Sequence, residues 1–254
     1  YDRTFNLHRS GKITVQSKIP VNSQADLAMA YTPGVGRICK AIAEEPEQAY
    51  NLTIKQNSVA IVTDGSAVLG LGNLGPEAAL PVMEGKAMLF KEFAGIDAFP
   101  ICLATQDTDA IVETVKNIAP VFGGVNLEDI SAPRCFQIEA KLRQILDIPV
   151  FHDDQHGTAI VTLAAVINAL KLVNKSIEEI SIVINGAGAA GVAIGRLLRK
   201  AGAKTILMCD SKGIIFKNRQ GLTPEKIEFA GEKEGSLLDA MVGADVFLGV
   251  SMPG

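Results

Sequence analysis

Short apolar runs alternate with helix-patterned segments along most of this 254-residue chain. In segment 133–146, for example, apolar residues recur at spacings of three and four, namely Cys135, Ile138, Leu142 and Ile145. The runs predicted as strands are Val59–Thr63, Ala98–Leu103, Val121–Leu127, Pro149–Phe151, Ile180–Ile184, Thr205–Cys209 and Asp245–Val250. Strands that alternate with helices are typical of an α/β protein with a parallel sheet and crossover helices, so we predict that fold class.

The composition excludes several other classes of protein. The longest uncharged stretches, such as Thr158–Leu170, are too short to span a membrane. A formal net charge of −4 without a long basic run argues against nucleic acid as a partner. The four cysteines are scattered without a CxxC pair, which favours reduced thiols. We therefore expect a soluble, cytoplasmic protein.

Two features indicate how the chain is divided. The segment Thr158–Leu172 is apolar on almost every helical face, so we predict a buried helix that links two domains. We place the boundary near residue 156, with one domain at 1–155 and the other at 156–254. The chain begins at Tyr1 and ends just after an apolar run, which favours a fragment whose second domain is incomplete.

A glycine-rich turn follows the predicted strand Ile180–Ile184 and precedes a helical pattern at Val192–Ala201. Its GxGxxG spacing is typical of dinucleotide binding, because glycines allow a tight turn and let the backbone approach a pyrophosphate at the helix N-terminus. The next strand leads to an acid, 24 residues after Gly186, about where a carboxylate binds the adenosine ribose. An ordinary strand–turn–helix is the alternative. The residues predicted to bind the cofactor are Gly186, Ala187, Gly188, Ala189, Ala190, Gly191 and Asp210.

The choice of cofactor depends on the charges near Asp210. A carboxylate there favours NAD, because it would repel the additional phosphate of NADP. Lys212 and Lys226 lie downstream and would hold that phosphate if NADP were bound. We predict NAD, with NADP as the alternative. A second GxGxxG match, Gly70–Gly75, is followed by Pro76 and lacks a ribose-binding acid at the right distance, so we interpret it as a loop.

Acidic residues follow two of the predicted strands: Glu128 and Asp129 follow one, and Asp153 and Asp154 follow the next. The carboxyl ends of parallel strands share one edge of a sheet, so these carboxylates are expected to converge. A bound cation would offset their repulsion, and oxygen ligands favour Mg²⁺ or Mn²⁺. The alternative is that they are surface acids that cap helices. The run His152–His156 resembles the zinc motif HExxH only superficially, because aspartate replaces its glutamate, and zinc is not predicted.

Lys86 is unusual because it lies on the apolar stripe of a helical pattern at Glu77–Ala94. Its neighbours at three and four residues are Val82, Met83, Leu89 and Phe90. A lysine in a low-dielectric site beside a cation has a lowered pKa and can act as a base. The alternative is a lysine at the core edge with its amine in water. Tyr31 lies on a loop that opens a helix near Val35 and could donate a proton, although a structural role is the alternative.

Taken together, these motifs resemble the malic enzyme family, in its short bacterial form, over essentially the whole chain. The matching blocks are Tyr31–Gly36, Thr63–Gly65, Gly70–Gly75, Gly85–Lys86 with Leu89–Phe90, Glu128–Asp129, Phe151–Ala159 and the glycine turn at 186–191. The resemblance implies an N-terminal substrate and metal domain followed by a Rossmann-type NAD(P)-binding domain. It also implies oxidative decarboxylation of L-malate to pyruvate and CO₂ with NAD(P) and Mn²⁺ or Mg²⁺, by a homodimer or higher homo-oligomer.

The resemblance assigns the general base for the C2 hydroxyl of malate to Lys86, with Asp153 beside it. It assigns the acid that protonates C3 to Tyr31. Two positions depart from the family pattern: Ala67 stands where longer forms carry an arginine for the substrate carboxylate, and Asn73 where aspartate is usual. The metal ligands that the resemblance implies are Glu128, Asp129 and Asp154.

Three alternatives stay open from the sequence. A non-oxidative malate or oxaloacetate decarboxylase of the malolactic type would use the same base, metal and cofactor without releasing a reduced nicotinamide. A nucleotide-binding regulatory protein would need none of the catalytic residues, and the presence of Lys86, Tyr31 and the carboxylates argues against it. An inactive fragment is the third alternative, and an intact mass would test it.

Overall fold

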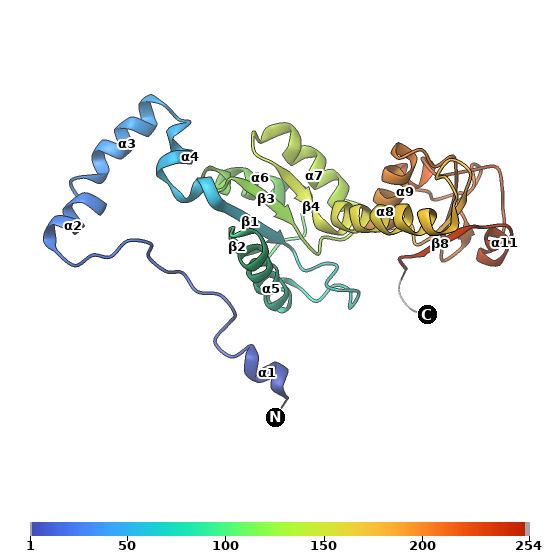
Figure 1. Ribbon diagram of the computed structural model, residues 1–254, viewed down its shortest axis with the longest axis horizontal. Helices are drawn as coiled ribbons and strands as arrows, with labels where there is room; N and C mark the ends of the chain where they lie inside the picture. The colour runs from blue at the N-terminus through green and yellow to red at the C-terminus, as the bar shows by residue number, and fades with distance from the viewer. Residues whose placement is uncertain (1, 252–254) are drawn as a thin grey trace. The chain divides into compact units, whose positions relative to one another are not determined.

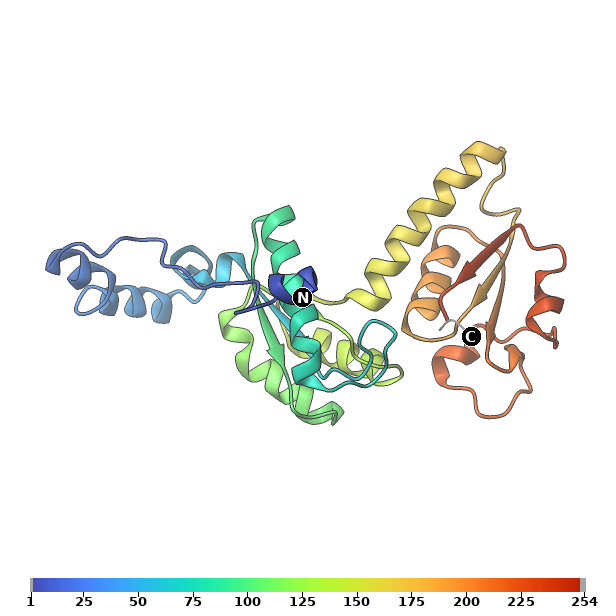
Figure 2. The ribbon, with the colours of Figure 1, turned by 90° about the horizontal axis from the view of Figure 1, so that it is seen from below.

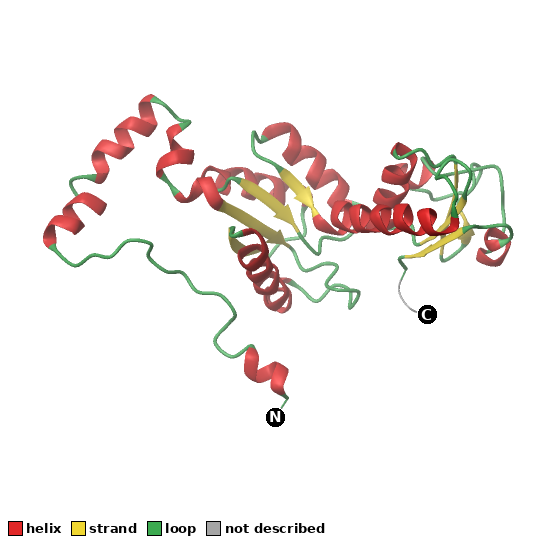
Figure 3. Ribbon diagram, in the orientation of Figure 1, coloured by secondary structure: helices red, strands yellow, loops and turns green. Residues whose placement is uncertain are grey.

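The computed structural model describes residues 2–251, which contain two four-stranded sheets (Figures 1 and 3). The chain divides into two compact units. The first contains residues up to Ser66, 73–126 and 141–150, and the second contains 67–72, 127–140 and the residues from Phe151 onward. The α/β fold class predicted from the alternation of strands and helices is confirmed, and the domain boundary near residue 156 stays a prediction.

The first sheet has the strand order β2-β1-β3-β4. β1 (Ser58–Thr63) and β2 (Asp97–Cys102) pair in parallel, with Ser58 opposite Asp97. β3 (Gly124–Leu127) is buried at every residue, as expected for a strand covered on both faces. β4 (Val150–His152) is the last strand of this sheet, and all four strands lie within a few residues of their predicted positions.

Helix α5 (Pro76–Ala94) packs on this sheet through a narrow stripe of its surface. Proline at its first position has the φ angle of a helix, and Gly95 ends it in the left-handed conformation at φ +68°. Met83 and Ala87 pack against Ile61 of β1 in one buried cluster. The fully buried residues of α5 are Ala79, Met83 and Ala87.

The N-terminal part of the chain buries none of its side chains between residues 2 and 57. An extended segment joins its first two helices, and these helices lie at some distance from each other (Figure 1). The short helices of this part are α1 (Arg3–Leu7), α2 (Gln24–Ala30), α3 (Val35–Glu44), α4 (Gln48–Leu52) and η1 (Ile54–Asn57). Those between the later strands of the first sheet are α6 (Thr108–Ile118), η2 (Ala119–Val121) and α7 (Arg134–Ile145).

The second sheet has the strand order β7-β6-β5-β8. β5 (Ser181–Asn185) pairs in parallel with β6 (Thr205–Asp210) on one side and with β8 (Val246–Gly249) on the other. β7 (Gly213–Ile214) pairs antiparallel to β6 and was not predicted, because two residues are too few to give a sequence signal. The helices of this part are α8 (Asp153–Val173), α9 (Ala189–Lys200), α10 (Pro224–Ile227) and α11 (Leu237–Met241).

Helix α8 differs from the buried helix that its apolar composition predicts. It packs beside α9 (Figure 2) and contributes Ala159, Val166 and Leu170 to the core of the second sheet. Leu163 is partly buried against the same core, but most of the other apolar residues of α8 are exposed, with 65% of Val161 and 86% of Leu172 accessible to solvent. The prediction of burial on every face is wrong, because one neighbouring helix covers only one stripe. By length and composition α8 would also pass as a membrane-crossing helix, a test that core helices of soluble proteins pass as well.

Candidate metal centre and nucleotide site

Three carboxylates meet where β3 and β4 end. Glu128 and Asp129 directly follow β3, and Asp154 lies in the first turn of α8, which begins immediately after β4. One carboxylate oxygen from each residue lies within 4.8 Å of the others. Asp129 adopts a left-handed backbone conformation at φ +53°, and its N–H donates to Oδ2 of Asp154 at 3.2 Å. The convergence that the sequence predicts from two neighbouring strand ends is therefore present for Glu128, Asp129 and Asp154, whereas Asp153, the fourth acid of that prediction, does not belong to the cluster.

The burial of these acids makes their closeness costly. Glu128 is 5% exposed and Asp129 is 3% exposed, while Asp154 is half-buried. Two like charges about 4 Å apart repel each other by about 4 kcal/mol at the effective dielectric of a protein. A divalent cation held by the three carboxylates would replace this repulsion with attraction. The donor set consists of carboxylate oxygens alone, so the residues fit Mg²⁺ or Mn²⁺ better than zinc.

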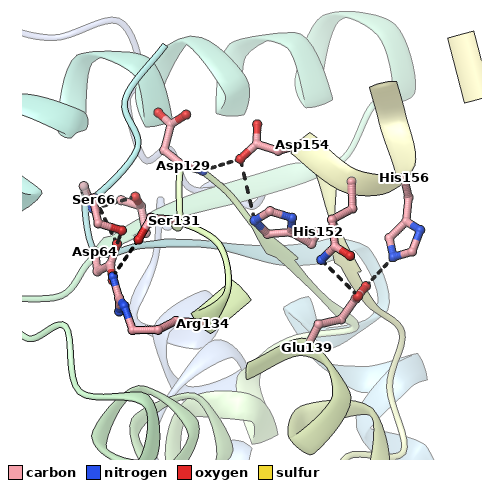
Figure 4. A network of polar contacts seen from close by, with 12 residues as sticks. Asp64, Ser66, Asp129, Ser131, Arg134, Glu139, His152, Asp154 and His156 are labelled. Carbon is pink, nitrogen blue, oxygen red and sulfur yellow. Dashed lines mark hydrogen bonds and ion pairs between the residues drawn. The ribbon is translucent and has the colours of Figure 1, made fainter. Parts of the chain in front are cut away.

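A buried histidine contacts Asp154 and is drawn below it in Figure 4. His152, the last residue of β4, is fully buried, and its Nε2 is 3.6 Å from Oδ2 of Asp154. Burial lowers the pKa of His152 to about 4, and this outweighs the opposing effect of nearby carboxylates. The ring is therefore neutral at neutral pH.

A buried glutamate that was not predicted from the sequence lies on the other side of His152 in Figure 4. Glu139 of α7 is 6% exposed, and its Oε1 lies 2.6 Å from Nε2 of His156. Its Oε2 accepts a hydrogen bond from the Gln155 amide at 3.3 Å. The sequence did contain a signal for a buried charge here. Glu139 is four residues after Cys135 and so lies on the apolar stripe of its helix, as Lys86 does on the stripe of α5.

Lys86 lies at the edge of the buried stripe of α5, as a half-buried residue. Val82 and Phe90, one turn before and one turn after it, are partly buried against the core that contains Met83. The predicted apolar surroundings of Lys86 are therefore present on this side. Leu89 differs from the prediction, because it is 42% exposed on the outer face of the helix.

Tyr31 and Asp153 occupy different kinds of position. Tyr31 is the C-terminal cap of α2, and 68% of it is exposed. Asp153 is the first residue of α8, and its side chain folds back over the first turn, where a side chain at Gly157 would overlap its carboxylate. Tyr31 and Lys86 belong to the first compact unit, whereas Asp153 and the three clustered carboxylates belong to the second. The catalytic and metal-binding roles of these residues stay predictions.

The glycine turn between β5 and α9 borders a cavity of about 450 Å³. Gly186 adopts φ +125°, which favours glycine, and Gly188 is the N-terminal cap of α9. The helix begins at Ala189, three residues before its predicted start, so its first N–H groups come directly after the turn. The residues that line the cavity include Gly186, Ala187, Gly188, Asp210, Thr223 and Lys226. This is the strand–turn–helix setting that pyrophosphate binding requires.

Gly191→Ala should disrupt this turn, because an added Cβ would overlap the carbonyl oxygen of Gly186. We expect the free energy of unfolding to fall by about 1–3 kcal/mol, the usual cost of overpacking. Chemical denaturation measures the change. Gly188→Ala is the matched control, since its Cβ would meet no atom within 4 Å and its φ of −88° suits alanine. Equal stability of the two variants would contradict the close approach of α9 to the turn.

Asp210 ends β6 and is held by two cations. Its Oδ1 accepts from Nη2 of Arg219 at 2.6 Å, and its Oδ2 accepts from Nζ of Lys226 at 2.8 Å. Burial alone would raise the pKa of Asp210, but the hydrogen bonds from Arg219 and Lys226 outweigh burial and lower it to about 2. Lys212 contributes its backbone N–H to Oδ1. Arg219, which is as buried as Asp210, was missed because nothing in the sequence pairs an arginine with an acid nine residues before it.

The fold and these sites define a class: an α/β protein with a dinucleotide-type glycine turn and an oxygen-ligand site for a divalent cation. A family model described as "Malic enzyme, N-terminal domain" matches residues 10–108 and 104–143, and one described as "Malic enzyme, NAD binding domain" matches residues 155–246. The chain belongs to the malic enzyme family.

Individual relatives agree with the family models. The NAD-dependent malic enzyme of Geobacillus stearothermophilus is 59% identical over 100% of this chain and 54% of its own length. The bifunctional malic/malolactic enzyme of Bacillus subtilis (strain 168) is 58% identical over 100% of this chain and 64% of its own length. A solved structure, the NAD-dependent malic enzyme of Thermotoga maritima, superposes with a TM-score of 0.95 at 48% identity, over 99% of this chain and 69% of its own. The chain thus spans between 54% and 69% of the length of these relatives.

Proposed function

We propose that this protein oxidatively decarboxylates L-malate to pyruvate and CO₂, with reduction of NAD(P) and a requirement for Mn²⁺ or Mg²⁺. The observation that carries the proposal is the cluster of Glu128, Asp129 and Asp154, with ligand oxygens within 4.8 Å of one another in a chain matched by both malic enzyme domain models. The dinucleotide-type cavity beside Gly186 supports the cofactor requirement.

The chain's own residues would supply the proton transfers. Lys86 would take the proton of the C2 hydroxyl, since it lies half-buried beside Val82 and Phe90 at the edge of the buried stripe of α5. A divalent cation on the three carboxylates would make that hydroxyl more acidic and polarise the resulting ketone, and the nicotinamide would accept the hydride from C2. The C3–C4 bond then breaks, so that the C4 carboxylate leaves as CO₂ and its electron pair forms the enolate of pyruvate, and Tyr31 would return a proton to C3. Asp153 would lie beside the base.

Product analysis tests the reaction type. Oxidative decarboxylation yields one pyruvate and one reduced nicotinamide for each L-malate consumed. A malolactic reaction yields lactate with no net reduction, and the name of the B. subtilis relative makes it the second candidate function. We expect pyruvate and reduced nicotinamide in equal amounts. Lactate without reduced nicotinamide would replace our proposal by the second candidate.

We propose NAD as the preferred nicotinamide cofactor, with Asp210 as the residue that disfavours NADP. Relatives named NAD-dependent and others named NADP-dependent malic enzyme both match nearly the whole chain, so the family does not decide between the two cofactors. Asp210 engages Arg219 and Lys226, the two cations that would otherwise attract a 2′-phosphate.

Asp210→Ser should free both cations and shift the ratio of kcat/KM for NADP over NAD by about 10-fold toward NADP, since one hydrogen bond to a charged group contributes about 1.5–3 kcal/mol. Steady-state kinetics with each cofactor measure the ratio. The double variant Asp210→Ser/Lys226→Ala is the control and should lose most of the gain. An unchanged ratio in Asp210→Ser would remove Asp210 from cofactor selection.

We further propose a cytoplasmic homodimer or higher homo-oligomer. All four cysteines are free thiols, which supports a reducing compartment. The N-terminal segment exposes large apolar side chains, including 70% of Met29 and 85% of Val15, which supports their burial against a second copy. Light scattering on the purified protein tests the assembly, and a monomer at all concentrations would contradict it.

A further inference from the structure

Glu139 is a charged side chain on the buried face of α7, where its neighbours are apolar. Cys135, Ile138 and Leu142 of the same helix are fully buried, and Glu139 lies among them at 6% exposure. Burial of a carboxylate is unfavourable by several kcal/mol unless it is hydrogen-bonded to suitable partners. Its retention at this position therefore depends on the groups that it binds.

Both side-chain partners of Glu139 come from one turn of one helix. Oε1 binds the ring of His156 at 2.6 Å and Oε2 accepts from the amide of Gln155 at 3.3 Å. An ionised carboxylate has no proton to donate, so Nε2 of His156 carries the proton in this contact. The His156 ring also packs against Phe151, with centroids 5.4 Å apart. Glu139 thus binds two consecutive side chains of the first turn of α8.

This turn is the one that presents Asp154 to the other two carboxylates. Asp154 directly precedes Gln155, and a rotation of the first turn of α8 would move its carboxylate away from Glu128 and Asp129. A hydrogen bond from the backbone N–H of Asp129 fixes the Asp154 side chain on the side of the carboxylate cluster. The two hydrogen bonds of Glu139 fix the same turn on its other side. Figure 4 shows Asp154 and Glu139 on opposite sides of His152.

We propose that Glu139 is a positioning residue for the metal centre: by binding Gln155 and His156, it fixes the first turn of α8 so that Asp154 faces Glu128 and Asp129. The inference rests on the proposed metal site and adds to it a residue that touches neither metal nor substrate. Outer-shell groups of this kind typically change metal affinity by about 10- to 100-fold when they are removed.

The test is the Kd of Mn²⁺, measured from the electron paramagnetic resonance signal of free Mn²⁺ in titrations without malate or nicotinamide. Glu139→Ala should raise this Kd by about 10-fold, because the turn loses both bonds. Glu139→Gln should stay within about threefold of the unmodified protein, because its amide oxygen accepts from Gln155 while its NH₂ donates to the other tautomer of His156. This pair separates positioning from charge, since both variants lose the same negative charge.

Two further variants control for folding. Ile214→Ala removes a fully buried side chain from a different core cluster, so it should lower the melting temperature and leave the Kd of Mn²⁺ unchanged. His156→Ala removes the shorter of the two hydrogen bonds by changing the more exposed partner, so it serves as the test if Glu139→Ala does not fold. We expect it to raise the Kd of Mn²⁺ by at least about threefold.

Each outcome decides the proposal. Unchanged Kd values in Glu139→Ala and His156→Ala would overturn it, and so would equal weakening in Glu139→Ala and Glu139→Gln, which would assign the effect to charge. Absence of Mn²⁺ binding by the unmodified protein would overturn the proposed metal site as well. Binding by the unmodified protein with no effect of Glu139 would overturn the positioning role alone.

Discussion

Lys86→Ala should lower kcat for malate oxidation by about 10³-fold, within the range that a positioned general base contributes, and leave the Kd of Mn²⁺ within about twofold. The reason is the position of Lys86 at the edge of the buried stripe of α5, between the partly buried side chains of Val82 and Phe90. Steady-state kinetics and a metal titration on the same samples measure both quantities.

The matched control for this variant is Lys91→Ala on the same helix. Lys91 is exposed, and its Nζ binds Asp97 at 2.7 Å, a surface ion pair whose loss costs less than about 1 kcal/mol. Turnover in this control should therefore stay close to that of the unmodified protein. Turnover of Lys86→Ala equal to that of Lys91→Ala would remove Lys86 from the proton transfer.

Asp154→Asn should weaken Mn²⁺ binding by at least about 100-fold, because loss of a ligand exceeds the usual effect of an outer-shell group. It removes one of three carboxylates whose oxygens lie within 4.8 Å, and with it a third of the charge that attracts the cation. Mn²⁺ should raise the melting temperature of the unmodified protein by mass action and leave that of the variant unchanged. A thermal shift series over Mn²⁺ concentration measures both.

The control for this variant is Asp147→Asn, which removes the same charge from an exposed position before β4. Its response to Mn²⁺ should match that of the unmodified protein. If Asp154→Asn binds Mn²⁺ with unchanged affinity, Asp154 is not a ligand, and the convergence of the two strand ends needs another explanation.

The strands and the carboxylate cluster were predictable because they depend on local pattern and topology. Each predicted strand is an apolar run, and acids that follow neighbouring strands must share one edge of the sheet, as Glu128 and Asp154 do. The glycine turn at Gly186 was predictable for the same reason, since a strand and a helix on either side fix its setting.

The features that were not predicted depend on which surfaces meet. The apolar composition of α8 gives no sign of which faces are covered, so Val161 was expected in the core and is exposed. Ile145 likewise continues the periodic apolar stripe of α7 yet is 48% exposed, because the stripe extends beyond the surface on which the helix packs. Glu139 and Arg219 bind groups brought close by tertiary folding, and the sequence alone does not show which groups these are.

Reduction of NAD by L-malate should be followed with added Mn²⁺ and again after removal of the metal by a chelator. We expect reduction that requires both malate and Mn²⁺ and that returns when Mn²⁺ is restored, because the cluster of Glu128, Asp129 and Asp154 would hold the cation. Reduction of NAD at the same rate without a divalent cation would contradict the assigned metal centre. Absence of reduction with either NAD or NADP would contradict the oxidative reaction itself.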